Sequence, residues 1–187
     1  MPDYHVKRCF IALPVDEAMV CDLRDVVRSI EIDGMRATEP EKLHVTVKFL
    51  GDVGDPEMPD VLEAMRLAAE DVEPFELQLI GVRYFPNPRR IRVLAAMLDE
   101  PEPVMRLQQQ LDDACDAIGF RREGRAYHPH VTLGRFKRAP KHAPDMRLVE
   151  TPEAVLPVDR MVLYQSILHH HSVEYVKLAE VMLGAVN

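Results

Sequence analysis

The 187-residue chain contains no tryptophan, only three cysteines and no long apolar run. A membrane-spanning helix needs about 20 mostly apolar residues, so none is expected, and the amino terminus lacks the basic and apolar regions of a secretory signal. Cys9, Cys21 and Cys115 are odd in number and form no C-x-x-C pair. They are interpreted as reduced core residues of a cytoplasmic protein, which disfavours a disulfide scaffold and a redox function.

The chain also has no excess of positive charge. Its 23 basic and 31 acidic side chains give a formal net charge of −8. A broad, sequence-independent nucleic-acid groove normally appears as a basic excess. We therefore expect a compact target, such as a small nucleotide or one end of a nucleic acid, bound within a single domain over residues 1–187.

Hydrophobic periodicity predicts strands and helices that alternate along the chain. Strands are expected at residues 6–13, 43–50, 75–82, 91–98, about 130–136, 161–168 and 173–182; helices are expected at 16–30, from about 59, and at 103–118. Residues 137–157 are rich in proline and lysine and are predicted to form a surface loop.

One supersecondary order occurs twice, over residues 6–50 and again over 91–136. In each copy a strand, an acidic turn and a helix lead to a second strand. This duplication predicts an α+β fold of two similar lobes. We expect antiparallel sheets with flanking helices, related by a pseudo-two-fold axis around a central cleft.

The second strand of each copy carries the pattern His-x-Thr-x, at residues 44–47 and 130–133. Residues i and i+2 of a strand point to the same face, so His44 projects with Thr46 and His130 with Thr132. If the two strands are neighbours, two imidazoles and two hydroxyls converge on one small volume.

This set of side chains suits phosphodiester chemistry. Opening a cyclic phosphodiester needs a base that takes a proton from water and an acid that protonates the departing sugar oxygen. Histidine fills either role near neutral pH, and threonine hydroxyls donate hydrogen bonds to phosphate oxygens. The scheme requires neither a metal nor another cofactor.

Strand parity adds further candidates around this site. Lys48 is expected on the face of His44, where it would border the phosphate site or lie solvated at the rim. Phe136 is expected on the face of His130, where it would stack on a base; packing in the core is the alternative. Arg135 is expected on the opposite face if the strand is regular, as a structural residue or as a backbone contact that only a bulge or twist would bring within reach.

A basic cluster beside the turn at 85–88 is a candidate contact for RNA phosphates. It contains Arg89 and Arg90, together with Arg92. A solvated surface patch is the alternative interpretation.

Two rival functions remain open. The pair His128 and His130 has a spacing that can place two metal ligands on one strand face, which would favour a metal-dependent hydrolase or metal-binding protein. The intervening Pro129 and the missing acidic partner argue against it, and residues 169–171 (His-His-His) are interpreted as an exposed turn. The other rival is an RNA-binding module without catalysis.

The chain resembles the two-histidine phosphoesterases, specifically the RNA 2′,3′-cyclic phosphodiesterases, also described as 2′-5′ RNA ligases. The resemblance rests on both His-x-Thr-x segments with their flanks and on three further segments, which together span residues 9 to about 180. These segments are 9–14, 43–51, 85–89, 129–135 and 162–166.

The resemblance implies hydrolysis of a terminal 2′,3′-cyclic phosphate to a 2′-phosphate, and 2′-5′ ligation when an RNA 5′-hydroxyl replaces water. It implies that His44 is the general acid and His130 the general base, with Thr46 and Thr132 holding the phosphate. RNA ends are the expected substrates, with small cyclic nucleotides or 2′-5′ oligonucleotides as the alternative. The protein is expected to be a monomer without an obligate protein partner.

Two departures from the family pattern stand out. Many relatives carry tryptophans near the first motif and in the middle strand, so base stacking here must come from tyrosine or phenylalanine. His128 also precedes Pro129, where the family commonly has arginine.

Overall fold

The computed structural model describes residues 5–30, 32–87, 89–170 and 172–184. In chain order, its strands and α-helices are β1 (Val6–Pro14), α1 (Glu17–Ser29), β2 (Met35–Ala37), β3 (His44–Gly54), α2 (Met58–Glu70), β4 (Phe75–Asn87), β5 (Arg90–Leu98), α3 (Glu102–Ala117), β6 (His130–Phe136), β7 (Val155–Val158), β8 (Arg160–Leu168) and β9 (Val173–Met182). Among these helices, none is long and apolar enough to cross a bilayer.

The strands form one continuous antiparallel sheet that spans both lobes. Its order is β7-β4-β5-β6-β3-β1-β8-β9, and β2 pairs with β6. One lobe contains β3, β1, β8 and β9, the other contains β6, β5, β4 and β7, and β3 meets β6 at the centre. The predicted two-lobed α+β fold is confirmed, with the sheets of the two lobes joined into one.

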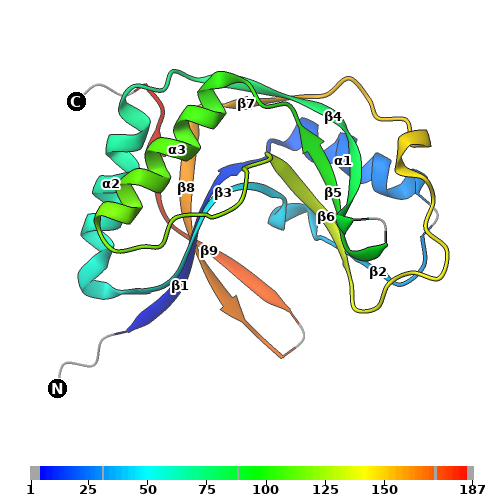
Figure 1. The fold of residues 1–187 in the computed structure, drawn as a ribbon, viewed down its shortest axis with the longest axis horizontal. Helices are drawn as coiled ribbons and strands as arrows, with labels where there is room; N and C mark the ends of the chain where they lie inside the picture. Colours follow the sequence, from blue (N-terminus) through cyan, green and yellow to red (C-terminus); the bar gives the residue numbers. More distant parts are fainter. Residues whose placement is uncertain (1–4, 31, 88, 171, 185–187) are drawn as a thin grey trace.

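The helices are exchanged between the lobes. Helix α3 follows β5 in the chain but packs against β3 and α2 in the other lobe. Helix α1 follows β1 but borders Leu133 of β6. Figure 1 shows α2 and α3 side by side near β8 and β3, whereas α1 lies near β4 to β6. This exchange ties the lobes together and leaves the other face of the motif strands open.

Local sequence explains how α1 begins and which side it buries. The carboxylate of Asp16 accepts a hydrogen bond from the Met19 backbone N–H at 2.9 Å, which caps the helix. Met19, Leu23 and Val26 then recur at helical spacing and are buried. Apolar burial of this kind holds each helix against the sheet.

The predicted loop over residues 137–157 was partly wrong. It contains a 3₁₀ turn at Met146–Leu148 and the start of β7, which pairs with β4 at the edge of the sheet. Pro157 hid this strand, because proline is tolerated only where a strand has a free edge. Strand β2 was also missed, since three residues are too few to show a period.

Candidate active site

Val45 of β3 and Val131 of β6 are partners in the antiparallel ladder at the centre of the sheet. Both side chains are fully buried. Because side chains alternate along each strand, the residues that flank each valine point to the opposite, open face. Antiparallel register then places His44 across from Thr132 and Thr46 across from His130. The two motifs therefore meet as the sequence predicts.

The two histidines are held in the same way. His44 Nδ1 lies 2.8 Å from the carbonyl oxygen of Lys42, and His130 Nδ1 lies 2.7 Å from that of His128. A carbonyl only accepts, so each Nδ1 carries a proton and donates it. This leaves both Nε2 atoms for proton transfer. The hydroxyl of Thr46 lies 3.1 Å from His44 Nε2.

Aromatic rings support each imidazole. His44 packs between Phe10, with ring centres 4.9 Å apart, and Tyr175, in an edge-on contact at 5.3 Å. His130 stacks on Phe85 at 5.3 Å. These contacts restrict rotation of the rings and so fix the directions of the two Nε2 atoms.

The surroundings of His44 lower its pKa. Burial is the largest cause, because it disfavours the charged imidazolium, and the positive charges of Arg135 and His130 act in the same direction. The hydrogen bond to the Lys42 carbonyl opposes them. In the free protein, the balance favours neutral His44.

A β-bulge follows the threonine in both motif strands. In β3, Thr46 pairs with Ala12 and Lys48 with Ile11, so Val47 is the extra residue. In β6, Thr132 pairs with Ala95 and Gly134 with Leu94, which makes Leu133 the extra residue. A bulge of one residue reverses the alternation of every side chain beyond it.

The bulges overturn three expectations. Lys48 does not share the face of His44: it is only 3% exposed and forms an ion pair with Asp112 of α3. Its ammonium also donates to the carbonyl of Arg121 at 2.6 Å. Phe136 turns into the core, where it is 4% exposed, so core packing, the alternative to base stacking, is confirmed. Arg135, expected on the far face, lines the same cavity as His44.

The same reversal exposes a residue that sequence reasoning did not consider. Phe49 stands at the position of β3 that corresponds to Arg135 in β6, five residues after the histidine. Its side chain is 65% exposed and lies 6.0 Å from Phe10, measured between ring centres. The open face thus carries an exposed aromatic ring in one lobe and a guanidinium in the other.

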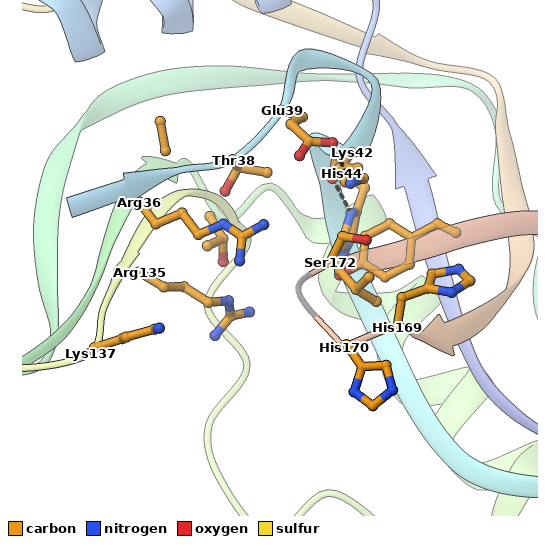
Figure 2. Close-up of a pocket in the computed structure, with 14 residues that line it drawn as sticks. Arg36, Thr38, Glu39, Lys42, His44, Arg135, Lys137, His169, His170 and Ser172 are labelled. Carbon is orange, nitrogen blue, oxygen red and sulfur yellow. Dashed lines mark hydrogen bonds and ion pairs between the residues drawn. The ribbon is translucent and has the colours of Figure 1, made fainter.

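A cavity of about 480 Å³ adjoins the site between the two lobes. His44 and Thr132 line it, whereas His130 and Thr46 lie outside its lining. Figure 2 shows Arg36, Arg135 and Lys137 on one side of the cavity, and His44, Ser172 and His169 facing them. The other lining residues are Ala37, Thr38, Glu39, Lys42, His170, Val173 and Tyr175.

Arg89 and Arg90 lie at the turn between β4 and β5 and do not line this cavity. Their backbone N–H groups donate to the side-chain oxygen of Asn87 at 3.0 and 3.1 Å. Both side chains are exposed. Their contact with substrate stays a prediction.

The described residues contain no group of three or more His, Cys, Asp or Glu side chains that would hold a metal ion. His128 does not join His130: its Nδ1 lies 2.6 Å from the carboxylate of Glu100 at the surface. His169 and His170 are exposed, and His171 lies outside the described residues. The three cysteines are free thiols. Cys9 and Cys115 are buried, as expected of core residues, but the expectation was wrong for Cys21, which is exposed on α1.

Comparisons with known proteins agree on one family. Residues 20–169 match the model of the 2′-5′ RNA ligase superfamily. The chain is 39% identical to the RNA 2′,3′-cyclic phosphodiesterase of Methanothermobacter thermautotrophicus over 133 residues, 70% of this chain and 71% of the relative. It is 31% identical to that of Aeropyrum pernix over 164 residues, 85% of this chain and 92% of the relative.

Solved structures share the fold. A crystal structure of a protein from Thermus thermophilus matches with a TM-score of 0.82 and 27% identity, over 96% of this chain and 100% of that one. E. coli LigT complexed with 3′-AMP matches with a TM-score of 0.79 and 22% identity, over 97% and 100%. The second likeness supports the architecture alone.

Proposed function

The chain belongs to the 2′-5′ RNA ligase superfamily, and from this premise we propose that it hydrolyses the 2′,3′-cyclic phosphate of an RNA end to a 2′-phosphomonoester. The observation that carries the proposal is the pairing of Val45 with Val131, which sets the two His-x-Thr motifs on one open face. The relatives named RNA 2′,3′-cyclic phosphodiesterase support the choice of substrate.

The proposed reaction divides proton transfer between the two imidazoles. His130 Nε2 accepts a proton from water as the water oxygen bonds to phosphorus. The bond from phosphorus to O3′ breaks, and O3′ takes a proton from His44 Nε2. One water is added, and the phosphate remains on O2′. The acid and base assignments follow the family resemblance, whereas the two bonds from Nδ1 to backbone carbonyls support the availability of both Nε2 atoms.

Binding of the reacting phosphate is proposed for Thr46, Thr132 and Arg135. The two hydroxyls flank the histidines on the open face, where they can donate to non-bridging oxygens. Arg135 lines the cavity beside His44 and Thr132, and a guanidinium can bind phosphate through two parallel hydrogen bonds. Together they would hold the phosphorus in line between the imidazoles.

Phe49 is the proposed platform for the base of the terminal nucleotide. Its exposed ring lies on the open face beside Phe10, which itself contacts His44. Base stacking on an aromatic side chain is tolerant of sequence, because every base has a π-face. In this chain, phenylalanine would take the place of the tryptophans found in many relatives.

An RNA end bound at one compact site is compatible with the net charge of −8, since only local cations are needed. The free thiols are consistent with a reducing compartment, so we infer action in the cytoplasm. Because both motif strands of the site belong to one chain, we infer that a monomer is sufficient.

A product assay in excess chelator tests the function. A short RNA with a 2′,3′-cyclic end should be converted to the 2′-phosphate alone, with the rate unchanged by the chelator. A parallel reaction with a 5′-hydroxyl RNA measures 2′-5′ joining by the same histidines. Loss of turnover on metal removal would favour the metal-dependent hydrolase, and a 3′-phosphate product would show that the wrong bond breaks.

A further inference from the structure

The cavity beside His44 carries a surplus of positive charge in a chain that is acidic overall. Arg36, Arg135 and Lys137 line it, and in the described part of the chain none of their side chains forms an ion pair with a carboxylate. The acidic lining residue Glu39 is paired with Lys42, and the positive charges of Lys42 and Arg36 lower its pKa. Three cations that form no ion pair among the described residues therefore face one hollow.

The sheet positions these cations in a row. Arg36 of β2 is the ladder partner of Arg135 in β6, and Lys137 follows β6 directly. Gly134 permits the close approach of β2: a β-carbon at this position would lie 2.6 Å from Met35 Sδ and 3.1 Å from the Arg36 carbonyl oxygen. Figure 2 shows the three side chains on the same side of the cavity. The row is thus built into the backbone.

The row extends away from the reacting centre. Arg135 lines the cavity beside His44 and Thr132, and its charge lowers the pKa of His44. Lys137 lies two residues beyond Arg135, which corresponds to about 7 Å along a strand. A reacting phosphate held by Arg135 leaves Arg36 and Lys137 for a second anionic group. The cavity of about 480 Å³ has room for a second group, within the usual range of ligand sites.

We propose that Arg36 and Lys137 bind a second phosphate of the substrate, the one attached to the 5′ oxygen of the ribose that carries the cyclic phosphate. The inference rests on the proposed function, because it assumes that the cyclic phosphate lies between His44 and His130. The 5′-phosphate of a mononucleotide and the phosphodiester of a longer RNA share this chemistry. The subsite would make the enzyme prefer RNA ends over unphosphorylated cyclic nucleosides.

Three substrates separate recognition of the 5′-phosphate from recognition of the cyclic phosphate and of a second nucleoside. They are adenosine 2′,3′-cyclic phosphate, the same compound with a 5′-phosphate, and the diadenosine RNA with a 2′,3′-cyclic end. We expect the 5′-phosphate to raise kcat/KM by about ten- to hundredfold in both longer substrates, as hydrogen bonds to charged groups do. The advantage should shrink as salt increases, because these cations are exposed.

Variants test which side chains produce the higher kcat/KM of substrates that carry a 5′-phosphate. In the double variant Arg36→Ala/Lys137→Ala, the ratio of kcat/KM between the longer substrates and the cyclic nucleoside should fall toward one. Arg36→Lys should retain part of the ratio. Arg66→Ala is the matched control, since this exposed arginine lies on α2, away from the cavity. Thermal melts establish that all variants are folded.

The outcomes are distinct. A wild-type advantage in both longer substrates that the double variant loses supports the subsite. An advantage for the dinucleotide alone would assign recognition to the second nucleoside and overturn the proposal. An equal loss on all three substrates would place Arg36 and Lys137 at the reacting phosphate and overturn it as well. If wild type hydrolyses none of the three, the proposed function itself fails.

Discussion

Val45 and Val131 face each other across the central pair of strands, at the junction of the two lobes. This one pairing sets the geometry of the site, because both valines are buried and their neighbours must point to the open face. The duplicated unit thereby becomes a single site with two imidazoles. Neither lobe holds this arrangement by itself.

Replacing either histidine should abolish most turnover. We expect His44→Ala and His130→Ala each to lower kcat by about two to four orders of magnitude, because each removes one proton transfer. The measurement is single-turnover cleavage of cyclic-ended RNA. His128→Ala is the control, since that imidazole is bound to Glu100 at the surface. Near-normal rates in either motif variant would exclude the paired mechanism.

The pKa of His44 should respond to Arg135. We expect His44 to titrate below 6.5 in the free protein, because burial and nearby positive charge favour its neutral form. Arg135→Gln removes one of those charges, so the pKa should rise, though burial keeps it below 6.5. NMR titration of the ring protons measures this, and Arg66→Gln is the control for a distant charge. A pKa that stays fixed or falls in Arg135→Gln would contradict the geometry.

The same shift predicts a difference between two pH–rate profiles. If His44 is the acid, it must be protonated to react, so kcat/KM should decline with rising pH according to its lowered pKa in the free enzyme. A bound phosphate anion favours the imidazolium, so the corresponding decline in kcat should lie at higher pH. If kcat and kcat/KM decline at the same alkaline pH, that result would argue against His44 as the acid.

Lys48 should contribute to stability instead of substrate binding. Lys48→Met leaves the buried carboxylate of Asp112 without its ion pair, so the free energy of unfolding should fall by about 3–5 kcal/mol. Urea denaturation measures the loss. The double variant Lys48→Met/Asp112→Leu should recover part of it, because no charge is then stranded. A higher KM with unchanged stability would instead show that Lys48 contributes to substrate binding.

Phe49→Ala should lower kcat/KM without lowering the stability of the fold. Stacking on one aromatic ring contributes about 1–3 kcal/mol per base, so kcat/KM should fall by at least about fivefold. The exposed position of the ring predicts a small change in unfolding free energy. Leu67→Ala, another exposed apolar residue, is the control on α2. If kcat/KM is unchanged in Phe49→Ala, the base does not stack on Phe49 and must bind at another surface.

The sequence was sufficient for the repeat, the motif strands and their convergence, because regular alternation determines which side chains share a face. It failed for Lys48, Arg135 and Phe136, which all lie beyond a bulge. In β6 there was one signal: apolar positions 131 and 133 are odd-numbered, whereas Phe136 is out of phase. In β3, Phe49 continues the alternation of Val45 and Val47, so the pattern concealed the bulge.

The cation row was beyond prediction for a different reason. Arg36 lies in a three-residue strand that pairs with β6 across nearly 100 positions of sequence, and no local period marks such a strand. Lys137 lies at the end of a motif strand in what the composition suggested was a loop. Their proximity depends on tertiary pairing and on the close approach at Gly134.

A crystal structure with uridine and vanadate, which together mimic the five-coordinate phosphorus of the reaction, tests the central geometry most directly. The account predicts one vanadate with His44 Nε2 and His130 Nε2 each about 3 Å from a different oxygen, on opposite sides of the vanadium. A vanadate bound by only one of the two imidazoles, with the other ring turned away, would contradict it.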